Sequence, residues 1–171
     1  MSIERRKKLV ELAKAYDTFV VEDAPYSLIS FDGSVMPAVK SFDKYGRVIY
    51  SGSTSKTVAP GLRIGWLAAD EESIQKLVYL KMRDDLQVNN MAQRQILYYL
   101  RDYDFDGHLK QVTGVYRQRR DRMVQAVKES VPEHTRIIVP NGGIFLWGEL
   151  PEGLDTMEMF DFVFQKNIAY V

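Results

Sequence analysis

The chain has 171 residues, of which 46% are hydrophobic and 27% are charged, so it is large enough and apolar enough to bury a core. Its 23 basic and 23 acidic residues balance, and no apolar run of about twenty residues occurs, which argues against nucleic-acid binding by this chain itself and against a membrane partner. The sequence contains no cysteine, which excludes disulfides and thiolate metal sites. We therefore expect a cytoplasmic globular protein.

The chain opens with a predicted helix and a predicted strand. Residues 2–16 have a helical pattern with Ser2 as the N-cap, and its inner face is predicted to carry Leu9, Leu12 and Ala13. The basic run within this helix is interpreted as a solvated face. Residues 18–22 then form an apolar, β-rich run typical of a buried strand.

Two side chains that could take part in catalysis or ligand binding follow this strand. Asp23 comes at its end, and Tyr26 lies three residues later, in a segment (26–29) that is expected to continue the strand. At the carboxyl end of an α/β strand, such side chains face the ligand crevice. Taken singly, Asp23 is as easily a turn cap before Pro25, and Tyr26 a core residue.

A hydroxyl-rich loop with one lysine separates the next two predicted strands, 48–50 and 62–69. Ser53 and Ser55 precede Lys56, and Arg63 follows it, so that hydroxyls and a guanidinium can converge on one anion beside a primary amine. Arginine grips phosphate through two parallel hydrogen bonds, and a neutral lysine amine attacks an aldehyde. This combination suggests pyridoxal phosphate.

Two other interpretations of this loop remain open. A nucleotide-hydrolase phosphate loop needs glycine directly before the lysine and five residues earlier, whereas these positions hold Ser55 and Tyr50. A polar surface loop with an incidental lysine is the simpler alternative. The upstream residues favour the cofactor, because pyridoxal phosphate needs a carboxylate at its ring nitrogen and a donor near its phenolic oxygen, which Asp23 and Tyr26 can supply.

The second half of the chain is predicted to be mainly helical and to end in a hairpin and a helix. Helices are expected over 70–86, 88–103, 105–131 and 154–165, and the strands 135–139 and 144–149 are expected to form a hairpin through Asn141-Gly142-Gly143. His108 and His134 have no partners at metal-ligand spacing and are interpreted as surface or structural residues. We therefore expect no metal site.

The motifs resemble those of the fold-type I pyridoxal phosphate enzymes. They are Val-Glu-Asp-Ala-Pro-Tyr (21–26), Ser-Gly-Ser-Thr-Ser-Lys-Thr-Val-Ala-Pro-Gly-Leu-Arg-Ile-Gly-Trp (51–66) and Pro-Asn-Gly-Gly-Ile-Phe-Leu-Trp (140–147). Within that group the chain is most similar to class I/II aminotransferases of the aminoadipate/kynurenine branch and to the aminotransferase-like half of MocR-type regulators. The resemblance covers nearly the whole chain.

The resemblance implies roles for six residues. Lys56 would hold the cofactor as a Schiff base and move the substrate's α-proton, Asp23 would pair with the pyridine nitrogen, and Tyr26 would pair with the phenolic oxygen. The phosphate would be held or surrounded by Ser53, Ser55 and Arg63. The implied activity is transamination between an amino acid and a 2-oxo acid by a homodimer.

The resemblance also implies an architecture. Residues 1–104 would be a portion of the large cofactor-binding domain, with an α/β fold and a mainly parallel sheet, and residues 105–171 would be a bridging helix and the start of an incomplete α+β small domain. The chain would then be an internal fragment lacking both ends, and weakly active or inactive alone. The alternative function is the effector-sensing domain of a MocR/GntR-type transcriptional regulator.

Overall fold

The computed structural model describes residues 1–132 and 134–170, which divide into two compact units. Unit 1 comprises Met1–Arg117 and Asn141–Gly143, and unit 2 comprises Gln118–Pro140 and Ile144–Val171. The division falls inside the long helix α4 (Phe105–Ser130). All candidate site residues belong to unit 1.

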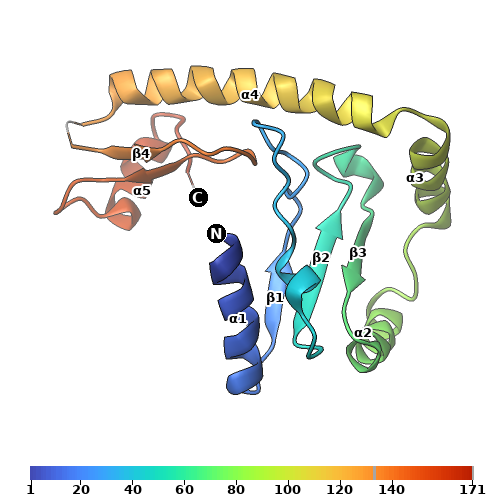
Figure 1. Cartoon of the computed structure of the whole chain (residues 1–171). Coiled ribbons are helices and arrows are strands. Elements are labelled where there is room, and N and C mark those ends of the chain that lie inside the picture. Colours follow the sequence, from blue (N-terminus) through green and yellow to red (C-terminus); the bar gives the residue numbers. More distant parts are fainter. Residues whose placement is uncertain (133, 171) are drawn as a thin grey trace. The chain divides into compact units, whose positions relative to one another are not determined.

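The sheet of unit 1 has three strands in the order β1-β2-β3 (Figure 1). They are β1 (Val20–Asp23), β2 (Val48–Ser53) and β3 (Gly65–Ala68). The first two are parallel, with Asp23 opposite Ser51, and the last two are antiparallel, with Ser53 opposite Gly65. Because β1 and β2 run in the same direction, their carboxyl ends, which carry the predicted site residues, meet at one edge of the sheet.

Helix α1 (Ile3–Ala15) begins where predicted, since the Ser2 hydroxyl accepts a hydrogen bond from the Arg5 N–H at 3.4 Å. Of its predicted inner face, Ala13 is buried and Leu9 half-buried, but Leu12 is exposed and Val10, which was not predicted, is buried in its place. The true face combines Arg6, Val10 and Ala13 with the half-buried Leu9, at spacings of three and four residues. The helix thereby contributes to a small core of Val10, Val39 and Val48, packed by Leu9, Val20 and Phe42.

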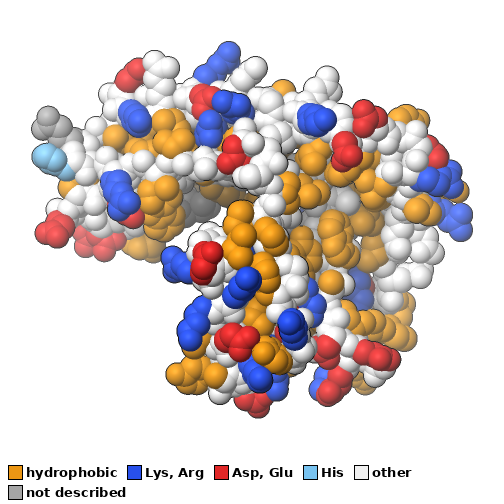
Figure 2. All heavy atoms as spheres, viewed as in Figure 1, with side chains coloured by type: hydrophobic (Ala, Val, Ile, Leu, Met, Phe, Trp, Pro, Cys, Tyr) orange, Lys and Arg blue, Asp and Glu red, His pale blue; other side chains and the backbone are white. Residues whose placement is uncertain are grey.

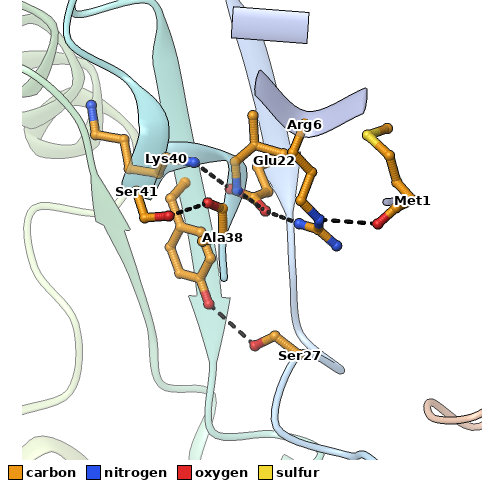
Figure 3. A network of polar contacts seen from close by, with 9 residues as sticks. Met1, Arg6, Glu22, Ser27, Ala38, Lys40 and Ser41 are labelled. Carbon is orange, nitrogen blue, oxygen red and sulfur yellow. Dashed lines mark hydrogen bonds and ion pairs between the residues drawn. The ribbon is translucent and has the colours of Figure 1, made fainter. Parts of the chain in front are cut away.

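Glu22 fastens β1 to two neighbouring segments (Figure 3). Its carboxylate accepts hydrogen bonds from the backbone N–H groups of Val39 and Lys40 at 2.8 and 2.9 Å, at the start of the 3-10 helix η1 (Val39–Phe42). It also pairs with the Arg6 guanidinium at 3.3 Å, although only 12% of the Glu22 side chain is exposed. Charge-assisted bonds of this kind are stronger than neutral ones, so Glu22 fixes the position of the strand that ends at Asp23.

The expectation that residues 26–29 continue the strand is wrong. They form a turn, in which the Ser27 N–H donates to the Ala24 carbonyl and the Ile29 N–H donates to the Tyr26 carbonyl, at 3.3 and 2.9 Å. Pro25 has no N–H to extend the sheet ladder, which favours the turn. Tyr26 therefore turns away from the direction of β1.

Two helices follow β3, within the ranges 70–86 and 88–103 that were expected to be helical. Asp70 caps α2 (Glu71–Asp84) by accepting from Ser73, and Asn89 caps α3 (Asn90–Asp102) by accepting from Met91 and Ala92. Large apolar side chains remain exposed on both helices, as do others elsewhere on the surface in Figure 2. On α2 and α3 they are Val78, Tyr79, Leu80, Met82, Met91, Leu97, Tyr98 and Leu100.

Unit 2 contains the predicted hairpin and terminal helix. β4 (Arg136–Ile138) pairs antiparallel with β5 (Trp147–Glu149), and α5 (Thr156–Phe164) is capped by Asp155. The three residues expected only to close this hairpin belong to unit 1 instead, where Gly142 bridges to Ser30. Across the part of the chain that the structure describes, no helix is long and apolar enough to cross a membrane.

Candidate active site

Asp23 and Tyr26 line a shared cavity of about 1060 Å³ in unit 1. Asp23 is the last residue of β1, and Tyr26 lies in the turn that follows it. The cavity is also lined by Tyr50 of β2 and by the segment Asn141–Gly143, which contains two glycines. Asp23 and Tyr26 therefore line one cavity that is large enough for a small organic ligand.

Lys56 lies in the loop between β2 and β3, and its side chain approaches Tyr26. Its ammonium nitrogen is 5.8 Å from the centre of the Tyr26 ring, and the residue is half-buried. The structure thus brings Lys56 to a residue of the cavity wall. The residues that line the cavity do not include Lys56 itself, nor Ser53, Ser55 and Arg63.

The loop that carries Lys56 is closed by Thr54, which the sequence interpretation had not singled out. The backbone N–H and the hydroxyl of Thr54 both donate to the Ile64 carbonyl, at 3.0 and 3.1 Å, and its own carbonyl accepts from Val58 at 2.8 Å. Thr54 and Thr57 are each only 5% exposed. Their buried polar groups hold the loop as a compact turn, with Lys56 near its tip.

The two predicted serines have different positions in this loop. The Ser53 hydroxyl accepts from the Ser55 N–H at 3.1 Å and donates to the Ile64 carbonyl at 3.4 Å, so it orders the loop. Ser55 contributes its N–H to that contact and is half-buried beside Lys56. Ser53 is therefore mainly a structural group in this arrangement.

Arg63 is exposed and has a left-handed backbone, with a φ of 55°. One of its guanidinium N–H groups donates to the Pro60 carbonyl at 3.3 Å. Because a guanidinium has five N–H groups in a planar fork, this contact fixes the side chain while leaving donor capacity for an anion.

Together, the six predicted residues provide an amine, a carboxylate, a phenol, two hydroxyls and a guanidinium on adjoining segments of unit 1. This set of donors and acceptors fits an anionic ligand that carries an aldehyde. Among residues 1–132 and 134–170, no cluster of three or more His, Cys, Asp or Glu side chains could hold a metal ion.

Two contacts with the site come from segments far along the chain. The Phe31 N–H donates to the Asn141 carbonyl at 2.7 Å, and the Gly143 N–H donates to the Ile29 carbonyl at 3.0 Å, which seats residues 141–143 beside the turn that carries Tyr26. His108 contacts the carbonyl of Thr57 at 2.9 Å. A paired glycine after asparagine was the only sequence signal for the first contact, and nothing in the sequence indicated the second.

The sequence matches the family model of the class I and II aminotransferases over residues 1–170. The aromatic-amino-acid aminotransferase 1 of Thermococcus litoralis is 41% identical over 171 residues, which is 100% of this chain and 41% of that protein. The HTH-type transcriptional regulator YisV of Bacillus subtilis is 30% identical over 168 residues, which is 98% of this chain and 35% of the regulator. The chain spans about two fifths of the length of the first curated relatives that it matches.

The fold agrees with this match. The crystal structure of the kynurenine aminotransferase of Pyrococcus horikoshii in complex with PMP covers 100% of this chain, with a TM-score of 0.92 and 39% identity, while this chain covers 42% of that one. The likeness confirms the α/β fold that the motifs predicted.

Proposed function

We propose, because the chain belongs to the class I and II aminotransferase family, that it binds pyridoxal phosphate and serves the transfer of an amino group between an amino acid and a 2-oxo acid. The observation that carries the proposal is the approach of the Lys56 amine to Tyr26, which shares a cavity with Asp23. An amine, a phenol and a carboxylate are the groups that this chemistry requires of the protein.

Each predicted residue has a role in this proposal. When bound, pyridoxal phosphate supplies a protonated aromatic ring that withdraws electrons from the substrate's α-carbon. Asp23 would keep the ring nitrogen protonated, and the Tyr26 hydroxyl would donate a hydrogen bond to the phenolic oxygen. Lys56 would hold the cofactor covalently and, once displaced by the substrate amine, carry the α-proton as a general base and acid.

The phosphate would be bound from the loop between β2 and β3. Arg63 supplies a guanidinium whose remaining N–H groups match two phosphate oxygens, and Ser55 supplies a hydroxyl beside Lys56. Ser53 would act chiefly by ordering the loop, because its hydroxyl is already engaged with Ser55 and Ile64.

We also propose that residues 1–171 alone turn over slowly. A substrate carboxylate needs a cation, and of the described residues the arginine that lines the cavity is Arg6, whose guanidinium is already paired with Glu22. The proposed organisation is a large-domain portion over 1–104 and a bridging helix with part of a small domain over 105–171. A cytoplasmic homodimer is the proposed setting, in keeping with the exposed apolar side chains on α2 and α3.

Cofactor capture tests the proposal directly. The purified chain is mixed with pyridoxal phosphate, reduced with borohydride and digested, and the label is located by peptide mass spectrometry. We expect the label on Lys56, its loss in Lys56→Ala, and its retention in Lys76→Ala, which removes an exposed lysine paired with Glu72. Label scattered over surface lysines, or no label, would contradict the proposal.

A second candidate function is effector sensing in a transcriptional regulator, which is favoured by the 30% identity to YisV over 98% of this chain. Such a domain would capture the cofactor without turning substrate over. The two functions are separated by measuring the release of 2-oxo acids from a panel of amino acids, with the borohydride-labelled wild type as the inactive reference. Release supports the transferase, whereas capture without release by a full-length protein supports the sensor.

A further inference from the structure

His108 joins the first turn of α4 to the loop that carries Lys56. Its Nε2 atom lies 2.9 Å from the carbonyl oxygen of Thr57, the residue that directly follows Lys56. Both residues belong to unit 1, although they are 51 positions apart in sequence. Thr57 is only 5% exposed, so its carbonyl has little access to water and depends on a protein donor.

The chemistry of this contact fixes which atom carries the proton. A carbonyl oxygen can only accept, so Nε2 of His108 must donate. A neutral histidine with its proton on Nε2 and a doubly protonated histidine both meet this requirement, so the contact survives protonation of the ring.

The ring of His108 is itself held in place by Tyr99 of α3. The two ring centres are 5.8 Å apart and the planes meet at 86°, which is an edge-to-face arrangement. A ring oriented in this way directs its Nε2–H along one line. The donor is therefore pre-positioned for the Thr57 carbonyl.

The loop consequently has two anchors. One lies at its base, where Thr54 donates twice to Ile64. The other is His108 at Thr57, one residue from the lysine. Beside this second anchor, turn bonds hold the segment after Lys56: the N–H groups of Thr57, Val58 and Ala59 donate to the Thr54 carbonyl at 3.3, 2.8 and 3.2 Å.

We propose that His108 is a positioning residue for Lys56: its hydrogen bond to Thr57 fixes the backbone beside the lysine and so aims the amine at the Tyr26 side of the cavity. The role assigned to Lys56 rests on the proposed function. The anchoring of the loop does not.

Three substitutions at this position separate the hydrogen bond from the packing. His108→Gln keeps an N–H donor at the same number of bonds from the backbone but removes the ring. His108→Phe keeps a ring against Tyr99 but has no donor, and His108→Asn has a donor that is too short to reach. His134→Gln changes the exposed histidine of unit 2 and serves as the control.

Two measurements are made on each full chain after circular dichroism has shown native helix content. Hydrogen–deuterium exchange without cofactor reports on the amides of Val58 and Ala59, and an absorbance titration with borohydride labelling reports on pyridoxal phosphate affinity at Lys56. We expect roughly three- to tenfold faster exchange and a similar loss of affinity in His108→Phe and His108→Asn, as for one lost hydrogen bond. His108→Gln and His134→Gln should stay within about twofold of wild type, which is less than the loss of one such bond.

The failures of the two proposals are distinguishable. If the wild type takes no label at Lys56, the proposed function fails, and the exchange data still decide whether His108 anchors the loop. If exchange and affinity in His108→Asn equal those of wild type, the inference about His108 is overturned while cofactor binding stands. Should His108→Phe fail to fold, the comparison of the Asn and Gln variants, which differ by one methylene group, gives the same decision.

Discussion

The Lys56 ammonium nitrogen and the Tyr26 ring lie 5.8 Å apart, although one residue is in the loop after β2 and the other in the turn after β1. The parallel pairing of the two strands brings these segments together at the same sheet edge. The ring face offers a weak attraction to the charged amine, and the hydroxyl offers a donor to a ligand. The two contributions can be removed separately.

Tyr26→Phe should lower pyridoxal phosphate affinity about three- to tenfold, because it deletes one hydrogen-bond donor and keeps the ring. Tyr26→Ala should lose a further factor of about two to five, since an exposed cation–π contact contributes about 0.5–1 kcal/mol. Absorbance titration measures both. Tyr98→Ala removes a comparable pair with Arg101 on α3 and should leave affinity unchanged. Equal affinity in Tyr26→Ala and wild type would exclude Tyr26 from the site.

Glu22→Ala should lower the free energy of unfolding by about 2–4 kcal/mol, because it leaves two backbone N–H groups without their acceptor and removes the ion pair of the Arg6 guanidinium. Urea denaturation in a Trp147→Phe background, where Trp66 reports on unit 1, measures this. Glu72→Ala is the matched control, since its pair with Lys76 is largely exposed and should cost less than about 0.5 kcal/mol. A Glu22→Ala variant as stable as this control would contradict the role of Glu22 in fixing the position of β1.

Gly142→Ala should detach residues 141–143 from the turn after β1. A Cβ atom at Gly142 would lie 2.2 Å from the Ile29 carbonyl oxygen, which is far inside contact distance. Hydrogen–deuterium exchange at the amides of Phe31 and Gly143 should accelerate at least tenfold on the scale of the hydrogen bonds lost. Gly61→Ala is the control, because a Cβ there meets nothing within 4 Å. Unchanged protection in Gly142→Ala would refute the close approach.

Acid should destabilise unit 1 through Asp43, whose side chain has no exposed surface. Burial raises the pKa of Asp43, but hydrogen bonds from the Lys40 ammonium and from three backbone N–H groups lower it from 3.8 to about 2. The backbone donors are Tyr45, Arg47 and Val48.

The sign follows from which state takes the proton first. As the pH falls, the unfolded chain protonates near 3.8 and the folded chain only near 2, so the stabilisation is complete above about pH 4 and is lost towards pH 2. Urea midpoints from pH 7 to 2 should therefore fall, and Asp43→Asn should be less stable at pH 7 but lose less on acidification. Asp32 should contribute to the fall as well, because hydrogen bonds from Ser34 and Ser30 hold its pKa at about 2. An Asp43→Asn curve parallel to wild type would contradict this assignment.

The sequence predicted the parts of this molecule that depend on neighbouring residues. Ser2 was expected to cap the first helix and does so, because a short polar side chain before an apolar periodic run satisfies the first free N–H groups. Asp70, Asn89 and Asp155 cap three of the other helices in the same way. Alternation and turn residues likewise predicted the β4–β5 pair. Asp23 was expected at the end of a strand because it directly follows an apolar, β-rich run, and it is the last residue of β1.

Contacts between distant segments were not predictable in this way. Leu12 and Val10 both fit the apolar stripe of α1, but only Val10 is buried, four residues from Arg6, which pairs with Glu22 of β1. No pattern in the residues around His108 indicated its contact with Thr57, which lies 51 positions away in the sequence. Such contacts depend on the relative placement of whole elements, which a single sequence does not encode in any local pattern.

The strand pairing also has a consequence for how the protein assembles. β2 and β3 are antiparallel and joined by residues 54–64, whereas β1 and β2 are parallel and joined by the longer segment 24–47. Closing the shorter loop costs less chain entropy, and local pairings form earlier than distant ones. Newly made chains should therefore form the lysine-bearing turn first and add the strand that ends at Asp23 afterwards. Pulse-labelled hydrogen exchange during refolding tests this order, and protection of the β1 amides before those of β3 would contradict it.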